Sequence, residues 1–177
     1  QVSIVLNRKI CVPVGGSLVM STSPLKRNRH IVVLSVPTYI LFLKTKGIAG
    51  HGSSPVLEYN AAVKMARAIT GLADYQPKIV LTPETRRLIQ TIADIHGLKV
   101  QINENNIDEI IRKFNDLRLA VYLRSITRMT ISPNVIHGGT KTNIVPDACE
   151  TEVDIRVLPN QNFDYVLREI KPLIGDS

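Results

Sequence analysis

The sequence predicts an α+β fold, with an antiparallel sheet that is covered by helices on one face. The first observation is CETEVDIRV, residues 149–157, in which apolar and polar side chains alternate as in a half-buried strand. The second is helical spacing of apolar residues over 56–73 and over 162–170. The third is the order of these segments, in which strands and helices are mixed rather than strictly alternating.

The composition is that of a globular protein. Its 177 residues are enough for one domain with extensions, and the hydrophobic fraction of 44% is ordinary for a globular protein and enough for a core. The net charge is +7, but only Lys26, Arg27 and Arg29 form a tight basic cluster, so we expect no nucleic-acid partner. Cys11 and Cys149 are far apart and suggest a reducing, cytoplasmic location. The apolar stretch 31–43 is shorter than the ~20 residues of a membrane span, so we expect no membrane partner.

The first 30 residues form an N-terminal extension that we leave unassigned, and residues 31–177 form the domain. Within the extension, VSIVL and ICVPV are typical of short strands, and a loop rich in Gly, Ser and Pro follows them. The domain begins with two strand candidates, IVVLSV and then TYILFLKTKG, in which β-branched and aromatic residues are frequent.

A long amphipathic helix is expected over 56–73, with Ser54 as its cap and Pro55 in its first turn. Two apolar stripes run along it: Ala62, Ala66, Ile69 and Ala73 form one, and Met65, Ala68 and Leu72 form the other. This apolar face is wider than one contact with a sheet requires. The helix is therefore either a well-covered core helix or one that also faces a partner subunit.

Two further helices are expected as an insertion over about 82–123. One runs from Thr82-Pro83 to about His96, where Gly97 ends it, and its apolar stripe is Leu88, Ile92 and Ile95. The other runs from about Asn106 to Leu123, with Ile107, Ile110, Phe114, Leu117 and Val121 at helical spacing.

The remaining elements complete a split βαβ pattern. A short strand over 128–132 precedes the loop SPNVIHGGTKTNIVPD, and the alternating strand 149–157 follows. Asn162 caps a last helix whose inward residues are Phe163, Val166, Leu167 and Ile170. Without the insertion the order is β-α-β-β-α, a ferredoxin-like split βαβ unit whose last strand is apparently missing.

Three polar residues are candidates for chemistry. His51 lies between two glycines in GHGSSP, Asn143 lies just before a strand, and Arg156 lies near the end of that strand. Each also has an ordinary structural explanation: a solvated loop histidine, a turn-forming asparagine or an arginine on a polar strand face. The four histidines have no partner at i+4 and no acidic pair lies at ligand spacing, so the sequence predicts no metal site.

Taken in order, these motifs resemble a known domain. KTKGIAGHGSSPVLEYNAAVKMARAI, ISPNVIHGGTKTNIVPDACETEVDIRVLP and a closing helix contain G-H-x-S-x-P, G-G-x-x-x-N-x-x-P and D-x-R. The string resembles the lid, or dimerisation, domain of a family of di-zinc metallopeptidases. That family includes aminoacylase, glutamate-releasing and yeast-vacuolar-type carboxypeptidases, acetylornithine deacetylase and succinyl-diaminopimelate desuccinylase.

The resemblance implies a function in a larger enzyme that cleaves N-acyl amino acids or peptides. In this family the two zinc ions lie in a separate catalytic domain, and the lid forms a homodimer through its helix, here 56–73, and an edge strand. By match, His51 reaches the partner's active site and donates a hydrogen bond to the oxyanion of the tetrahedral intermediate. Asn143 and Arg156, with Gly139 of the glycine pair, would bind the carboxylate or acyl end of the substrate.

The chain also departs from the family pattern. It contains no His-x-Asp motif, no Glu-Glu pair after glycine-rich sequence and no distal zinc-binding histidine. We therefore expect no catalytic zinc on this chain and no hydrolysis by the chain alone. A stand-alone dimerisation or binding module without chemistry is the alternative. An RNA-binding domain is a weaker one, because the strands offer only Tyr39 or Phe42 for base stacking.

Overall fold

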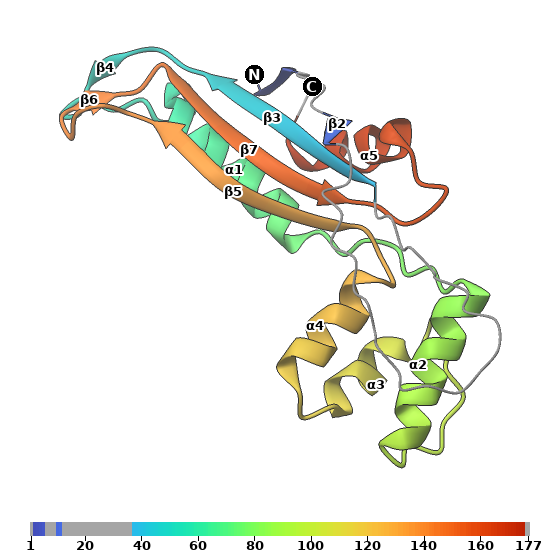
Figure 1. Cartoon of the computed structure of the whole chain (residues 1–177). Coiled ribbons are helices and arrows are strands. Elements are labelled where there is room, and N and C mark those ends of the chain that lie inside the picture. Colours follow the sequence, from blue (N-terminus) through green and yellow to red (C-terminus); the bar gives the residue numbers. More distant parts are fainter. Residues whose placement is uncertain (1, 6–9, 12–36, 176–177) are drawn as a thin grey trace.

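A computed structural model describes residues 2–5, 10–11 and 37–175. Its main sheet is antiparallel, with the order β1 (Val2–Val5), β3 (Thr38–Lys46), β7 (Ala148–Arg156) and β5 (Thr130–Gly138) (Figure 1). A short strand β2 (Ile10–Cys11) also pairs with β3. The expected α+β class is confirmed. The strand expected over 31–36, the loop before it and the basic cluster lie outside the described residues.

The centre of the sheet is the pairing of β3 with β7. Nine residue pairs are in register, from Thr38 with Arg156 to Lys46 with Ala148. The alternation read from the sequence is confirmed, since the side chains on one face of β7 are buried: Cys149, Thr151, Val153, Ile155 and Val157. Leu41 and Leu43 of β3 point to the same buried layer. The opposite face of both strands carries the charged residues.

Strand β5 is longer than expected, because residues 132–138 belong to it rather than to a loop. Pro133, which cannot donate a hydrogen bond to a neighbouring strand, lies within β5. Proline is tolerated here because β5 is at the edge of the sheet and its register with β7 shifts between Pro133 and Val135. The buried hydroxyl of Thr151 donates to the carbonyl of Val135 at 2.6 Å and holds this bulge in place.

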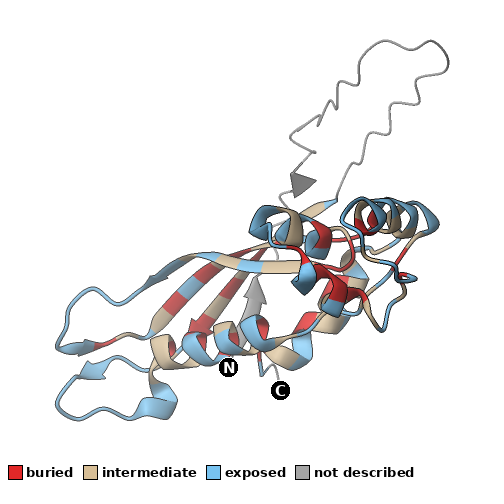
Figure 2. Cartoon of the chain, turned by 90° about the horizontal axis from the view of Figure 1, so that it is seen from below, coloured by how far each residue is buried: buried red, intermediate tan, exposed pale blue. Residues whose placement is uncertain are grey.

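Helix α1 (Ala61–Asp74) covers one face of the sheet, and Figure 2 shows its buried residues on the side that faces the strands. Ala61, Met65, Ala68 and Leu72 are the buried positions. The expected start at residue 56 is wrong. A 3₁₀ turn (Leu57–Tyr59) comes first, and the side chain of Asn60 caps α1 by accepting hydrogen bonds from the backbone N–H groups of Ala62 and Val63. Asn60 therefore takes the capping role expected of Ser54.

Helix α5 (Phe163–Ile170) lies beside α1 in the same layer, followed by a 3₁₀ turn (Lys171–Leu173). The expected cap is confirmed, because the side chain of Asn162 accepts a hydrogen bond from the N–H of Tyr165 at 2.9 Å. Val166 and Ile170 are fully buried, and the ring of Phe163 packs against Tyr39 of β3 with 5.4 Å between centroids.

The insertion between α1 and β5 is a small helical unit with its own core. It contains α2 (Pro83–Ile95), α3 (Ile107–Lys113) and α4 (Leu117–Ser125). Its buried cluster is separate from that of the sheet and consists of Leu81, Ile89, Ala93, Ile102, Ile107, Ile110, Ile111, Phe114 and Leu123. No helix in the described part of the chain is both long and apolar enough to cross a membrane.

Two expectations for the insertion are wrong. The single helix from 106 to 123 is broken, because Asp116 starts a new helix by accepting hydrogen bonds from the N–H groups of Arg118 and Leu119. Leu117 is then turned outward and is 78% exposed, as is Ile95 at the end of α2. The buried face of α2 is that of Ile89 and Ala93, one position away from the expected stripe of Leu88, Ile92 and Ile95.

The base of the insertion is closed by polar contacts. The N–H of Val80, where the chain enters, donates to the carbonyl of Thr127, where it leaves, at 2.8 Å. Beside it, the Arg128 guanidinium donates to both carboxylate oxygens of Asp108 at 2.5 and 3.1 Å. The Arg128 side chain is 4% exposed and that of Asp108 is 38% exposed. This ion pair joins α3 to the segment that leads into β5.

The other edge of β3 is occupied by the N-terminal strands. Val2–Val5 pairs with Phe42–Thr45, and Ile10–Cys11 pairs with Thr38–Tyr39, both antiparallel. In a split βαβ unit this is the position of the strand that follows the second helix. In the described residues after α5 there is no such strand, and β1 and β2 lie at that edge instead.

The Asp108–Arg128 pair generates a prediction about stability and pH. The Arg128 guanidinium lowers the pKa of the Asp108 carboxyl, so the ionised pair stabilises the fold fully above the ordinary pKa of aspartate, about 4. This contribution is lost as the pH falls through the lowered value. We expect Asp108→Asn to cost about 2 kcal/mol at neutral pH, less than a fully buried pair because Asp108 is partly exposed.

Urea unfolding monitored by circular dichroism at neutral pH and at about pH 3 would measure this difference. The matched control is Glu109→Gln, which removes the neighbouring exposed carboxylate paired with Lys113 and is expected to cost under about 0.5 kcal/mol. Equal losses for the two variants at neutral pH would show that the buried pair does not hold the insertion.

Candidate functional site

The candidate residues lie at both ends of the sheet. At one end, β3 and β7 continue into a projecting ribbon that we call the tip, residues 47–60 and 139–147 (Figure 1). The tip contains a two-stranded antiparallel pair, β4 (Gly50–His51) with β6 (Ile144–Val145). His51 lies directly opposite Ile144. The glycine-flanked histidine is therefore carried by a short strand rather than by an open loop.

Glycines make the tip possible through close packing. The N–H of Gly52 donates to the carbonyl of Asn143 at 2.8 Å, and a Cβ at Gly52 would lie 3.3 Å from the Asn143 backbone. At the base of the tip, a Cβ on Gly47 would lie 2.0 Å from the carbonyl oxygen of Tyr59. Neither Gly50 nor Gly52 has a positive φ. Close approach of the backbone is the reason for Gly47 and Gly52, whereas a Cβ on Gly50 would make only an ordinary contact with Val145.

The imidazole of His51 is exposed, and Ser53 holds its Nδ1 atom. The backbone N–H of Ser53 donates to Nδ1 at 3.2 Å, and the Ser53 hydroxyl lies 2.8 Å from the same nitrogen. Ser53 was not among the residues expected at the site. The sequence signal was present in the serine of G-H-x-S-x-P, two residues after the histidine.

Asn143 and Gly139 lie on the second segment of the tip, so the structure brings Asn143 next to the His51 segment. The side chain of Asn143 is exposed and makes no hydrogen bond within the described part of the chain. Gly139 has a φ of +74°, which favours glycine, at the point where the chain turns from β5 toward β6. His51 and Asn143 therefore lie on neighbouring segments of the tip.

Arg156 lies at the opposite end of the sheet. Its register partners are Thr38, at the start of β3, and Thr130, at the start of β5. Eight residue steps separate it from Ala148, where β7 leaves the tip, which at about 3.3 Å per residue is about 26 Å. No single site of ordinary size could contact both His51 and Arg156 of the same chain.

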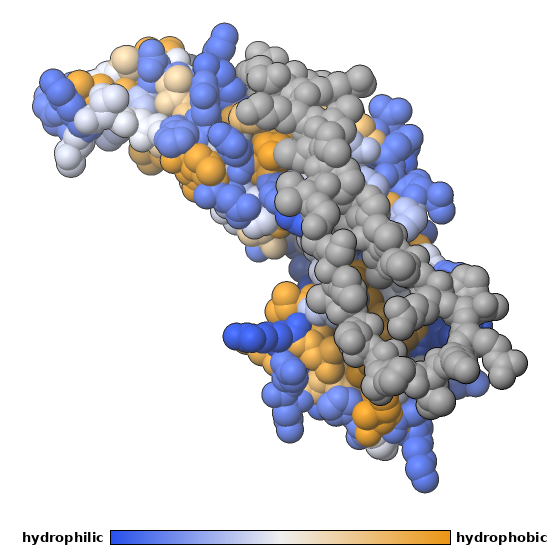
Figure 3. All heavy atoms as spheres, in the orientation of Figure 1, coloured by the Kyte–Doolittle hydropathy of each residue, from blue (hydrophilic) through white to orange (hydrophobic). Residues whose placement is uncertain are grey.

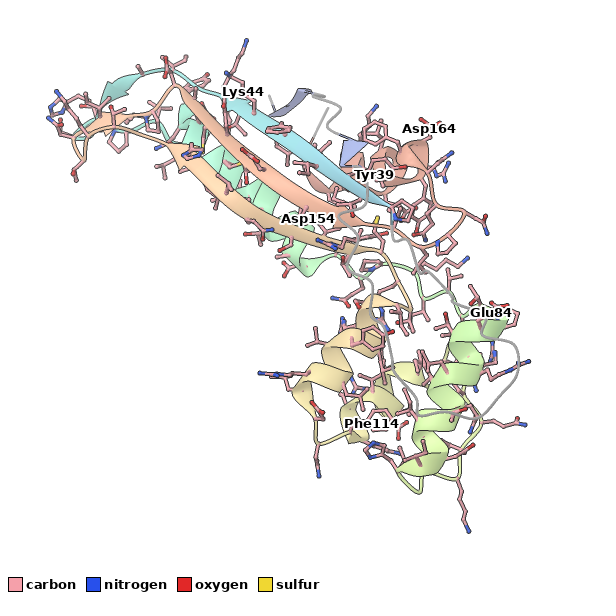
Figure 4. All side chains as sticks on the ribbon, in the orientation of Figure 1. Tyr39, Lys44, Glu84, Phe114, Asp154 and Asp164 are labelled. Atoms are coloured by element: carbon pink, nitrogen blue, oxygen red, sulfur yellow. The ribbon has the colours of Figure 1, made fainter. Side chains whose placement is uncertain are left out.

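The Arg156 guanidinium is held by Asp154, the acidic residue of D-x-R. Both side chains are on the open face of β7, where Figure 4 labels Asp154. Nε and Nη2 of Arg156 each donate to one carboxylate oxygen of Asp154 at 3.2 Å. A guanidinium has five N–H groups, and within the described residues the Nη1 side of Arg156 has no hydrogen-bond partner, so it could bind a second carboxylate. The arginine is 57% exposed and accessible to such a ligand.

The chain segment around His51 carries no charged side chain, although Lys141 is exposed on the neighbouring segment of the tip. No Asp, Glu, Lys or Arg occurs from Gly47 to Leu57. Large apolar side chains are exposed on the tip and the adjoining end of β5: Ile48, Val56, Leu57, Tyr59, Ile136 and Ile144. Figure 3 shows apolar residues on the surface of the tip as well as over the insertion. A surface of this kind is typical of a region that another molecule covers.

A second polar group, on the open face of the sheet, was missed as a group by sequence reasoning. Lys44, Glu150 and His137 are register partners across β3, β7 and β5 and line a shallow hollow of about 220 Å³. Lys44 pairs with Glu150 at 2.5 Å and, with a smaller contribution from His137, lowers the pKa of that carboxyl. Strand pairing created this row, which no spacing along the chain could indicate.

The described residues contain no group of three or more His, Cys, Asp or Glu side chains that could hold a metal ion. The free thiol of Cys149 is buried, which raises its pKa and makes it a poor nucleophile. The chemistry available at the tip is therefore hydrogen bonding from His51 and Asn143, and at the far end of β7 it is anion binding by Arg156.

Comparisons with known proteins agree with this architecture. The chain is 24% identical over 141 residues to the human N-fatty-acyl-amino acid synthase/hydrolase PM20D1. This match covers 77% of this chain and 28% of the relative. It is 29% identical over 72 residues to a probable carboxypeptidase S-like 1 of Dictyostelium discoideum, covering 40% of this chain and 15% of that protein. The chain thus spans less than a third of either relative.

Solved structures share the fold. An M20 family metallo-carboxypeptidase from Sulfolobus solfataricus has a TM-score of 0.50 at 20% identity, over 77% of this chain and 38% of that one. Human carnosine dipeptidase 1 has a TM-score of 0.51 at 14% identity, over 80% and 32%. The family model described as "Peptidase dimerisation domain" matches residues 41–176. The chain therefore belongs to the peptidase dimerisation domain family of the M20 metallopeptidases.

Proposed function

We propose that this domain is the lid of a zinc-dependent amidohydrolase and supplies His51 and Asn143 to the active site of a partner subunit. The observation that carries the proposal is the separation of the two groups. His51 and Asn143 lie at the tip, and Arg156 lies about 26 Å or more away along β7. If all three residues serve one substrate, they must come from two copies of the domain.

The role of His51 would be to stabilise an oxyanion. An N–H donor that is already in place favours the negative charge that develops on a carbonyl oxygen during acyl transfer. The exposed apolar side chains of the tip, such as Ile48 and Ile144, support this role, because covering them with another subunit would exclude water there and strengthen the hydrogen bond. The exposed amide of Asn143, in the turn just before β6, would bind the acyl end of the same substrate.

The role of Arg156 would be to bind the substrate carboxylate in the site of its own subunit. The free Nη1 side of its guanidinium fits a carboxylate ligand. N-acyl amino acids and peptides carry such a group, and the names of the relatives point to the same class: an N-fatty-acyl-amino acid synthase/hydrolase and a carboxypeptidase. Zinc would be held by a catalytic domain outside this chain.

Dimerisation would use the outward face of α1 and the edge strand β5. Ala66 and Ala73 are exposed and Ala62 and Ile69 are half-buried, which leaves a stripe of small side chains that another helix could approach closely. The Ala68 and Leu72 stripe faces the sheet and belongs to the core, so it is not available to a partner. Strand β5 has an unpaired edge in the described sheet, and Ile136 is exposed there.

Subunit complementation tests the proposal. This chain is co-expressed with a full-length M20 enzyme whose lid histidine has been changed to alanine, and hydrolysis of N-acyl amino acids by the purified mixed dimers is measured. We expect activity to be recovered, and to fall on the order of 100-fold when the chain carries His51→Ala. The control is His137→Ala, which removes another exposed histidine outside the tip and should leave the recovered activity unchanged.

The same mixed dimers test the separation argument. Arg156→Ala in this chain should not reduce the recovered activity, because the arginine of that site comes from the enzyme's own lid. Asn143→Ala should reduce it, since Asn143 lies with His51. Loss of activity with Arg156→Ala, or retention with His51→Ala, would contradict the assignment. Mixed dimers that stay inactive would favour the alternative, a dimerisation module without chemistry.

A separate prediction concerns the dimer interface. We expect the chain to be a dimer, and the double change Ala66→Arg and Ala73→Arg to give a folded monomer, because two charges would enter the helix contact. Sedimentation velocity measures the mass, and circular dichroism the fold. Leu117→Arg, at an equally exposed position on α4, is the control and should remain dimeric. A dimer that survives the double change would exclude α1 from the interface.

A further inference from the structure

We propose that Ser53 is a positioning residue that fixes the tautomer of His51, so that Nε2 carries the proton and donates to the substrate. The effect of Ser53 on the reaction rate rests on the proposed function of His51. The tautomer itself is a property of this domain alone.

The inference follows from which groups can donate. A backbone N–H is always a donor, and that of Ser53 points at Nδ1 of His51 at 3.2 Å. A protonated Nδ1 would place two hydrogens against each other. This N–H therefore favours the neutral ring with a bare, accepting Nδ1 and the proton on Nε2, but at 3.2 Å on an exposed ring it is the longer of two contacts that Ser53 makes with Nδ1.

The hydroxyl of Ser53 adds a second donor to the same nitrogen. Its Oγ lies 2.8 Å from Nδ1, a normal hydrogen-bond length. Because an Nδ1 without a proton can only accept, the hydroxyl must donate its hydrogen, and the two donors share the single lone pair of this nitrogen. Two donors from one residue then hold both the protonation state and the orientation of the ring.

The surrounding backbone makes this arrangement rigid. The N–H of Ser54 donates to the carbonyl of His51 at 3.0 Å, which closes the turn 51–54. The N–H of Gly52 is bound to Asn143 on the other segment. The Ser53 N–H is thus directed at the imidazole by a turn that is anchored on both sides. Nε2, on the far side of the ring, is left as the free donor of an exposed side chain.

A donor fixed in advance matters for an oxyanion site. A histidine that must first change its tautomer loses part of the benefit of a preorganised hydrogen bond, and a wrong tautomer in a catalytic histidine can abolish most of its effect. Ser53 would act on the rate through His51 and would not touch the substrate.

The test is a long-range proton–nitrogen NMR spectrum of the imidazoles of this chain at about pH 8, where ordinary histidines are neutral. The chain has four histidines, and His51→Gln identifies the signals of His51. In the unchanged chain we expect one tautomer, with Nδ1 unprotonated and Nε2 protonated. A spectrum in which His51 carries its proton on Nδ1 would overturn the proposal.

Three variants make the test specific. Ser53→Ala should move the His51 signals toward a mixture of tautomers, and Ser53→Thr, which keeps a hydroxyl, should preserve the single tautomer. Ser54→Ala is the matched control, since no hydrogen bond of its hydroxyl is found among the described residues. Backbone amide spectra check that each variant is folded. Identical His51 tautomers in the Ser53→Ala and Ser54→Ala chains would overturn the proposal.

Activity then separates this inference from the proposed function. In the mixed dimers described above, Ser53→Ala should lower kcat about tenfold with little change in KM, less than the loss of the donor itself. A shifted tautomer together with unchanged kcat in active mixed dimers would overturn the catalytic role of Ser53. If the mixed dimers are inactive with every chain, the proposed function fails, while the NMR result still decides the tautomer.

Discussion

The pairing of β3 with β7 is the constraint on which the rest of this structure depends. It joins residues more than a hundred positions apart, in nine consecutive register pairs. One end of this pair continues into the tip with His51 and Asn143, and the other end holds Arg156. A slip of one residue would turn every side chain of β7 to the opposite face of the sheet. The buried row from Cys149 to Val157 makes such a slip costly, so the core fixes the positions of the polar groups as well.

The tip depends on the backbone more than on side-chain packing. Its two segments are joined by strand pairing, by the bond from Gly52 to Asn143 and by the contact of Gly47 with Tyr59. Val145 is buried there, but Ile144, Ile48 and Leu57 are exposed. Such an element holds a histidine in a fixed place while leaving apolar surface uncovered. Covering that surface would release free energy, which would favour the binding of another molecule at the tip.

Much of the fold could be predicted from the sequence, because local patterns indicated it. The alternation of 149–157 gave the central strand and its buried face, and the caps at Thr82 and Asn162 gave two helix starts. The failures have physical causes. Residues 107–123 have helical spacing of apolar residues in the sequence, but Asp116 caps a new helix, and Leu117 and Val121 of the expected stripe are exposed. The segment around Pro133 was predicted as a loop. It is part of β5, which tolerates proline because this strand lies at the edge of the sheet. At the site, motifs indicated His51, Asn143 and Arg156, but their separation depends on strand pairing and could not be read along the chain.

The hydrogen bond from Val80 to Thr127 has an evolutionary consequence. It brings the entry and exit of the insertion together, so the 46 residues between them behave as a loop whose ends are already closed. The insertion also has a core of its own, separate from that of the sheet. Its helices can therefore lengthen, shorten or be exchanged without shifting α1 or β5. The site residues on the sheet and at the tip are thereby insulated from change in the insertion. Within one architecture, such a domain can change the size and helices of its insertion while the arrangement of the sheet and the tip stays the same.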